Sequence, residues 1–309
     1  MTTARRHTKQ ATTCAVLLLA AAGLASSPAA ASAEDNPHAP APATVGDTLW
    51  TWGNAALHAS NEVTFANFAE AGPIQAARLL GTPNIILAGH GLPADDAEAE
   101  RMTREAAGAH RLIWEITADG VTDGVAGGFV YEKRMALIRA LVDRYPRIEG
   151  VLLDDMSSVG IDKGFKPEHI RRVRELLPDP YRSVKVWGVV YTMNLDRPNM
   201  NEYIRELDVI NLWIWHAKDA GKQEECVARL AGLFPQKPIV LGVYLYDYGD
   251  GRRMPLDLLK QQCESALRLV KAGQIQGIVF LTITNDAETV GWAADWVRKV
   301  GAQKLPPRG

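Results

Sequence analysis

The sequence predicts a single (β/α)8 barrel, in which eight parallel strands alternate with helices around a closed sheet. Eight strand-like segments alternate with helix-like segments, a pattern that requires parallel βαβ units with right-handed crossovers. Apolar runs such as Val151–Leu153 lack the polar alternation of a half-exposed strand, so both of their faces are expected to be covered. Without an N-terminal leader of 33 residues, 276 of the 309 residues remain, close to the ~250 typical of one barrel domain.

Each strand and helix is predicted from its local pattern. Runs of β-branched and aromatic residues predict strands at Thr48–Trp52, Asn84–Ala88, Arg111–Ile116, Glu149–Asp154, Val184–Thr192, Val209–Trp215, Pro238–Tyr246 and Gly277–Thr284. Apolar residues at helical spacing predict helices at Asp95–Ala109, Tyr131–Asp143, Pro167–Leu177, Met200–Leu207, Lys222–Leu233, Leu256–Lys271 and Ala287–Val300. Between the first two strands, Glu62–Ala71 is the candidate for a short helix. An open doubly wound sheet is the alternative fold, but no Gly-rich loop follows the first strand.

The first 33 residues have the pattern of a signal peptide. Arg5, Arg6 and Lys9 precede an apolar stretch from Cys14 to Leu24, and residues 31–33 form a small-residue cleavage site. We expect cleavage near Ala33 and a secreted or periplasmic protein. The apolar stretch is shorter than the ~20 residues that span a bilayer, so no membrane anchor is expected.

The rest of the chain is expected to form one domain. Residues 34–46, with prolines among alanines, are predicted to be a disordered leader. Residues 47–301 are predicted to form the barrel, and residues 302–309 a C-terminal tail. Removing residues 1–33 takes away three basic residues and changes the net charge from −2 to −5. Because no basic tract is left to bind phosphates, the sequence argues against a nucleic-acid partner.

Two cysteines follow the leader, Cys226 and Cys263. They fall in consecutive predicted helices, which would be neighbours on the outer ring of a barrel. In an exported protein a disulfide between them is one expectation. Two free thiols are the other, since a sequence does not fix the distance between their Cα atoms.

Two adjacent carboxylates, Asp154 and Asp155, end the fourth predicted strand. Ligand chemistry in parallel sheets gathers at the carboxyl ends of the strands. Two carboxylates a few ångströms apart raise the pKa of one of them, so that an acid and a base are available together. The alternative is a strand followed by a turn or a helix cap, because Asp is favoured at both.

The alternation of strand side chains predicts which residues face the interior and the mouth of the barrel. Branched apolar residues such as Leu212 and Ile214 should face the helices, so the residues that alternate with them in the strand face inward. By this rule Glu115 faces inward from the third strand, and Trp187 from the fifth. From the first strand either Trp50 or Trp52 faces inward. The inward aromatic residues that we place at the mouth are Trp52, Tyr191, Trp213, Trp215, Tyr244 and Tyr246.

Aromatic rings and carboxylates at one mouth favour a carbohydrate ligand. Sugar rings offer C–H faces to aromatic planes and hydroxyl groups to polar side chains. His216 and Asp247, which follow the sixth and seventh strands, complete the candidate substrate-binding residues. The alternative is that some of the aromatic side chains simply fill the barrel.

Among the remaining carboxylates, Glu115 is the favoured partner of the acid pair and Asp247 is second. Asp250 lies in a segment with turn composition. Asp286 precedes a predicted helix, where we expect it to be an N-cap. No G-x-S-x-G elbow is present, which argues against a serine triad.

Histidines near strand ends are candidates for a metal site. His58, His90 and His216 would join Glu115 and Asp154 in such a cluster. No H-x-H or H-E-x-x-H spacing is present, so no metal is expected.

The segment Leu153-Asp154-Asp155-Met156 resembles the fourth-strand motif of the O-GlcNAc hydrolase family and related hexosaminidases. These are barrel enzymes in which the strand ends in an adjacent acid pair. The first acid orients the acetamido group of the substrate, which attacks the anomeric carbon, and the second protonates the leaving oxygen. The resemblance covers this short segment and implies that Asp154 is the polarising residue and Asp155 the general acid.

The sequence departs from chitinase-like barrels, whose D-x-x-D-x-D-x-E signature places acids at four positions of this strand. Glu149, Leu152, Asp154 and Met156 occupy those positions here, which argues against a chitinase mechanism. The chain is also similar to secreted bacterial barrels of unassigned function that have a comparable acid pair and a Trp-x-Trp strand.

These features predict a secreted glycoside hydrolase-like enzyme, with Asp154, Asp155 and Glu115 as catalytic residues and no cofactor. Neighbouring strand residues point apart, so either the substrate supplies the nucleophile or one Asp works with a carboxylate from another strand. A non-catalytic carbohydrate-binding barrel is one alternative. A metal-dependent hydrolase that uses His90, His216 and Asp154 is the other. The sugar, the linkage and the oligomeric state stay open.

Overall fold

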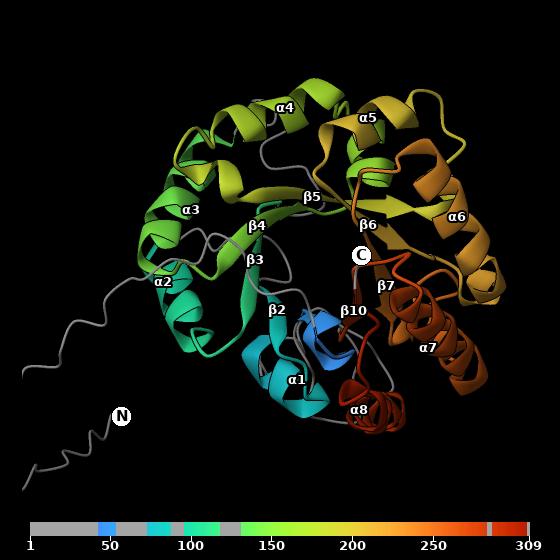
Figure 1. Ribbon diagram of the computed structural model, residues 1–309. Coiled ribbons are helices and arrows are strands. Elements are labelled where there is room, and N and C mark those ends of the chain that lie inside the picture. The colour runs from blue at the N-terminus through green and yellow to red at the C-terminus, as the bar shows by residue number, and fades with distance from the viewer. Residues whose placement is uncertain (1–42, 54–72, 88–95, 118–130, 283–285, 308–309) are drawn as a thin grey trace, which may run out of the picture. The chain divides into compact units, whose positions relative to one another are not determined.

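The computed structural model describes residues 43–53, 73–87, 96–117, 131–282 and 286–307, and Ala41–Gly309 form one compact unit. Parallel strands close into a barrel in the order β1-β10-β7-β6-β5-β4-β3-β2, with helices around it (Figure 1). The predicted (β/α)8 barrel is confirmed, and the open doubly wound sheet is excluded. The predicted signal peptide, the Glu62–Ala71 segment, His58 and His90 lie outside the described residues.

The barrel strands agree with the predicted segments to within a few residues. They are β1 (Leu49–Trp52), β2 (Asn84–Leu87), β3 (Arg111–Glu115), β4 (Ile148–Leu153), β5 (Lys185–Tyr191), β6 (Val209–Trp213), β7 (Ile239–Tyr244) and β10 (Gly277–Leu281). The predicted seventh strand ends early, because its last residue, Tyr246, belongs to a small antiparallel hairpin formed by β8 (Tyr246–Asp247) and β9 (Arg252–Arg253).

A helix follows each barrel strand along the chain. The helices are α1 (Pro73–Leu80), α2 (Asp96–Glu105), α3 (Glu132–Arg144), α4 (Pro167–Glu175), α5 (Met200–Glu206), α6 (Gln223–Leu233), α7 (Leu256–Lys271) and α8 (Ala287–Gly301). Helix α1 was not predicted. At the start of α8 the Asp286 side chain accepts a hydrogen bond from the backbone N–H of Glu288 at 3.1 Å, so the predicted N-cap is confirmed. Within the described ranges, none of the helices is both long and apolar enough to cross a membrane.

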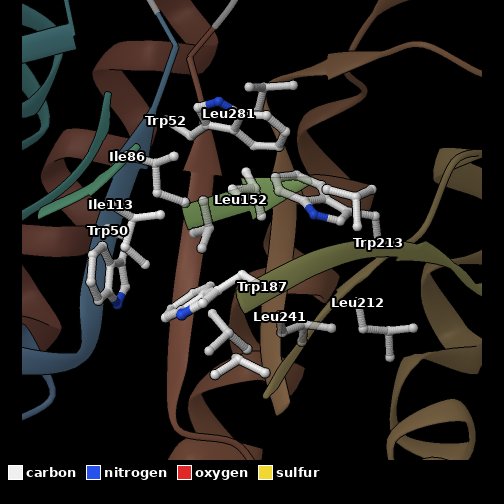
Figure 2. Packing of buried hydrophobic residues seen from close by; sticks show 14 of the residues in the cluster. Trp50, Trp52, Ile86, Ile113, Leu152, Trp187, Leu212, Trp213, Leu241 and Leu281 are labelled. Carbon is white, nitrogen blue, oxygen red and sulfur yellow. The ribbon is translucent and has the colours of Figure 1, made fainter. Parts of the chain in front are cut away.

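Aromatic side chains fill the barrel interior. Trp50 of β1 and Trp187 of β5 lie side by side, with ring centroids 5.3 Å apart, although their strands are not neighbours (Figure 2). Nearer the mouth, Trp52 and Trp213 make a similar contact at 5.5 Å. Gly242 of β7 also faces inward, because a Cβ atom there would overlap the Trp213 ring. The predicted inward phases of these strands are therefore confirmed.

The ends of the described chain pair with each other at the base of the barrel, opposite the carboxyl ends of the strands. Thr44 forms an antiparallel bridge with Lys304, and the backbone N–H of Val45 donates to the carbonyl oxygen of Gln303 at 2.8 Å. Val45 is fully buried. Residues 43–46 of the predicted leader and 303–305 of the predicted tail are thus ordered parts of the barrel unit, because each satisfies the backbone groups of the other.

Cys226 on α6 and Cys263 on α7 are free thiols in this structure. Cys226 is half-buried and Cys263 is buried. Burial raises the pKa of both thiols, that of Cys263 well above 9.0. Of the two alternatives that the sequence leaves open, the structure therefore has the free thiols.

Candidate active site

The acid pair lies where β4 leaves the barrel. Gly150 faces the interior, since a Cβ atom there would lie 3.0 Å from Nε1 of Trp187, and Asp154 continues this inward phase. Asp155 adopts a left-handed conformation, with φ 51° and ψ 12°. Its backbone N–H donates to Oδ1 of Asp154 at 2.7 Å. The left-handed residue interrupts the strand alternation, so the two neighbouring carboxyl groups do not have to face opposite sides.

Glu115, at the end of β3, is held beside the acid pair. Its side chain is almost fully buried, with 2% exposed. Trp52 donates a hydrogen bond from Nε1 to Oε2 of Glu115 at 3.2 Å, and the Thr117 hydroxyl donates to Oε1 at 3.3 Å. The same Thr117 oxygen accepts a hydrogen bond from the backbone N–H of Asp154 at 3.0 Å. A single hydroxyl group therefore connects the third and fourth strand ends.

Tyr191, at the end of β5, holds the other member of the pair. Its hydroxyl donates to Oδ1 of Asp155 at 2.6 Å, and it shares a side-chain hydrogen bond with Tyr244 of β7. The backbone N–H of Tyr191 donates to Oγ of Ser157 at 3.1 Å. The carboxyl group of Asp155 is thus fixed against the strand that follows it.

The surroundings of Asp154 favour its protonated form. Burial raises the pKa of Asp154 well above 3.8, and the charges of Asp155 and then Glu115 raise it further. Burial also raises the pKa of the Tyr191 and Tyr244 hydroxyls well above 10.0. The site therefore combines a carboxyl group whose pKa is raised with two further carboxyl groups that accept hydrogen bonds from Trp52, Thr117 and Tyr191.

The aromatic residues at the mouth form two layers. Trp52, Tyr191, Trp213 and Tyr244 are buried, with 0–4% of each residue exposed. Trp213 packs against Tyr244 with ring centroids 4.6 Å apart. Trp213 lies inside the barrel, where it supports rings nearer the surface.

The second layer is half-buried and consists of Trp215, Tyr246 and Tyr248. Trp215 lies 5.3 Å from Tyr191, and Tyr248 lies 5.8 Å from Trp215 and 5.1 Å from Tyr246, measured between ring centroids. Sequence reasoning missed Tyr248, because it follows β8 in the hairpin, where strand alternation no longer applies. It also missed Thr117, whose signal would have been a polar residue in the inward phase two positions after Glu115.

Asp247 serves as an anchor for the loop after β7. Its side chain is fully buried; Oδ2 accepts a hydrogen bond from Arg252 at 3.1 Å and Oδ1 accepts one from the backbone N–H of Ala217 at 3.3 Å. His216 lies beside this loop, with Nδ1 3.5 Å from Oδ1 of Asp250. These contacts place Asp247 and His216 in the support of the hairpin.

The structure brings most of the predicted site residues to one mouth. Hydrogen bonds and ring contacts link neighbouring members of the set, and a charge interaction links Asp154 to Glu115. The residues linked in this way are Trp52, Glu115, Asp154, Asp155, Tyr191, Trp213, Trp215 and Tyr244. In the parts of the chain that are described, His, Cys, Asp and Glu form no group of three or more suited to a metal ion. His90, the remaining member of the predicted metal set, lies outside them.

Met156, which follows the acid pair, points away from the mouth. It is fully buried. A Cβ atom added at Gly188 of β5 would lie 2.6 Å from the Sδ atom of Met156 and from the Leu207 side chain, so Met156 packs on the helix side of β5. In the chitinase signature this position carries the final Glu. Met156 therefore supplies neither an acid nor a side chain directed at the mouth.

No protein-family model matches the chain, and no curated protein matches it. Solved structures of glycoside hydrolases share its fold. The catalytic domain of a hyperthermophilic chitinase from Pyrococcus furiosus has a TM-score of 0.51 at 12% identity, over 84% of this chain and 98% of that chain.

Two further structures show the same likeness. An endo-alpha-mannosidase from Bacteroides thetaiotaomicron has a TM-score of 0.51 at 10% identity, over 82% of this chain and 97% of that chain. A beta-glucuronidase from Bacteroides uniformis has a TM-score of 0.51 at 13% identity, over 77% of this chain and 32% of that chain. At these identities the likeness establishes the barrel fold alone.

Proposed function

We propose that this protein is a glycoside hydrolase that cleaves a glycosidic bond at the mouth of its barrel. The observation that carries the proposal is the grouping of Asp154, Asp155 and Glu115: burial and neighbouring charges raise the pKa of the Asp154 carboxyl group, and hydrogen bonds hold the other two carboxyl groups. Glycoside hydrolysis needs such a pairing of an acid with a carboxylate. The shared fold with several glycoside hydrolases supports it.

In this proposal Asp154 is the general acid that protonates the leaving oxygen. Its raised pKa keeps the proton on Asp154 to a higher pH than on an ordinary aspartic acid. Glu115 is the second carboxylate, which Trp52 and Thr117 hold in place. Asp155, fixed by Tyr191, binds the hydroxyl or acetamido group next to the reacting carbon. The roles of the two aspartates are thus the reverse of those that the hexosaminidase resemblance implies.

Aryl glycosides with good and poor leaving groups test the proposal. Asp154→Asn should lower kcat/KM by ~10²–10⁴-fold for poor leaving groups and much less for activated ones, because only the former need a proton. Glu115→Gln should lower it for both. In the unchanged protein, activity should fall as pH rises through the pKa of Asp154, and the Asn variant should lose this dependence.

Two results would contradict the proposal. If Asp155→Asn, and not Asp154→Asn, shows the leaving-group dependence, the roles follow the resemblance instead. If a broad panel of glycosides is bound but none is turned over, the protein is a carbohydrate-binding barrel. Asp295→Asn on the exposed face of α8 is the control for the charge change alone, with Asp295 71% exposed.

Export remains part of the proposal, supported by the pattern of residues 1–33. N-terminal sequencing of the protein recovered outside the cytoplasm should begin at Glu34. Recovery of the intact N-terminus from the cytoplasm would contradict it.

A further inference from the structure

The three half-buried rings at the mouth, Trp215, Tyr248 and Tyr246, contact one another in sequence. We call them the aromatic surface. It begins beside the acid pair, since Trp215 packs against Tyr191, whose hydroxyl binds Asp155. From there it extends over two further rings, with centroid spacings of 5.8 and 5.1 Å. The surface therefore leads from the proposed cleavage point to the β8–β9 hairpin.

The rings beneath and beside the aromatic surface are less exposed to solvent than the surface itself. Trp213 and Tyr244 lie in the barrel and are 0% and 4% exposed, so they have no face left for a ligand. Trp215, Tyr246 and Tyr248 keep part of their surface open. Aromatic groups gathered next to polar catalytic groups and left half-open are typical of a site that receives an apolar ring face.

The hairpin that carries two of the three rings is braced from several sides. Asp247 binds Arg252 and the backbone of Ala217, and the backbone N–H of Gly249 donates to the carbonyl oxygen of Trp215 at 3.1 Å. Arg253 forms an ion pair with Asp286 at the start of α8, at 2.5 Å. Because the hairpin is fixed before a ligand arrives, ordering it on binding costs little.

The acidic groups at the start of the aromatic surface disfavour a ligand that carries a carboxylate. Glu115, Asp154 and Asp155 concentrate acidic groups where the chain of a ligand would begin. The two arginines of the hairpin are already paired, Arg252 with Asp247 and Asp250, and Arg253 with Asp286 and Glu288. A sugar that carries a carboxylate would meet repulsion from the acid group.

We propose that Trp215, Tyr248 and Tyr246 form a second sugar-binding subsite, so that the substrate is a neutral oligosaccharide of at least two sugar units. The proposal rests on the glycosidase function proposed above for the barrel mouth. A sugar unit stacked on Trp215 or Tyr248 places its neighbour at the acid pair, and the ring of Tyr246 continues the surface for a longer chain.

The test compares aryl glycosides of one, two and three sugar units, prepared in the chito, cello and manno series. In the series that is turned over, KM should fall about tenfold when a second sugar is added, which corresponds to about 1.4 kcal/mol. Tyr246→Ala and Tyr248→Leu should remove this gain, so that KM rises much more for the two- and three-unit glycosides than for the one-unit glycoside. Tyr246→Phe, which keeps the ring, should retain the gain. Tyr181→Ala is the control for loss of a tyrosine ring outside the site. Tyr181 is half-buried just before β5, and its hydroxyl donates to Asp143.

A second measurement separates the two proposals. Calorimetric titration with free di- and trisaccharides of the same series reports binding whether or not the protein is a hydrolase. Binding that strengthens with length and is lost in Tyr246→Ala, without turnover, would overturn the glycosidase function and leave the subsite standing. Turnover with the same KM for one, two and three units, or equal losses for all lengths in Tyr246→Ala, would overturn the subsite.

Discussion

The indole of Trp52 donates a hydrogen bond from Nε1 to Oε2 of Glu115 across the interior of the barrel, at 3.2 Å. The two residues end β1 and β3, which are separated in the sheet by β2. The same indole packs against Trp213. One side chain thus belongs both to the apolar filling of the barrel and to the polar site above it.

We expect Trp52→Phe to damage activity more than folding. Phenylalanine keeps much of the ring contact with Trp213 but removes the donor to Glu115. Hydrogen bonds to charged groups contribute roughly 1.5–3 kcal/mol, so kcat/KM should fall about 10- to 100-fold. Steady-state kinetics with thermal unfolding of the same sample measures this.

Trp114→Phe is the matched control for Trp52→Phe. Trp114 is also fully buried, but its Nε1 donates to Oγ1 of Thr103 on α2, on the helix side of β3. This change should lower the free energy of unfolding by about 0.5–1.5 kcal/mol and leave kcat/KM unchanged. Equal kinetic losses in both variants would mean that the Trp52 bond to Glu115 has no role in positioning.

Asp154→Asn should raise the melting temperature at neutral pH. Because burial and neighbouring charges raise the pKa of Asp154 in the folded state, the contribution of this group to stability is complete below 3.8 and is lost as pH rises through the folded pKa. Asparagine is uncharged at every pH and avoids this loss. Thermal unfolding between pH 4 and pH 8 should therefore show a gain that grows with pH. A gain independent of pH would contradict the raised pKa.

Gly242→Ala should destabilise the barrel. An added Cβ atom would overlap the Trp213 ring, and overpacking of a core costs typically 1–3 kcal/mol. Gly232, near the end of α6, is exposed and has no atom within 4 Å of such a Cβ, so Gly232→Ala should stabilise the helix by roughly 0.5–1 kcal/mol. Urea unfolding of both variants compares them, and opposite signs are the expected result.

The cysteines give a chemical check on the packing of α6 and α7. In a chain that begins at Glu34, unfolded without reductant, Cys226 and Cys263 should both react with a thiol reagent. In the folded protein Cys226 should react slowly, and Cys263 only after unfolding, because it is buried and its pKa is raised. Absence of free thiols in the unfolded sample would show a disulfide.

The sequence predicts the barrel strands well because buried parallel strands have an uninterrupted apolar pattern, as in Val151–Leu153. Helix α1 was missed because its eight residues make only about two turns, too short a stretch for the helical period to stand out in the sequence. The residues that shape the site most are harder to predict. The left-handed backbone of Asp155 has no glycine to signal it in the sequence. The position of Tyr248 depends on the braces of the hairpin, which come from distant parts of the chain.

The pairing of residues 43–46 with 303–305 determines how the molecule can be attached to anything else. Both ends of the described chain leave from the base of the barrel, opposite the strand ends that carry Asp154 and Tyr191. An affinity tag, a surface linker or a fused domain joined after residue 307 would hold the protein by its base, so the open end would face the surrounding solution. Immobilisation through that end should therefore leave access for large, insoluble ligands.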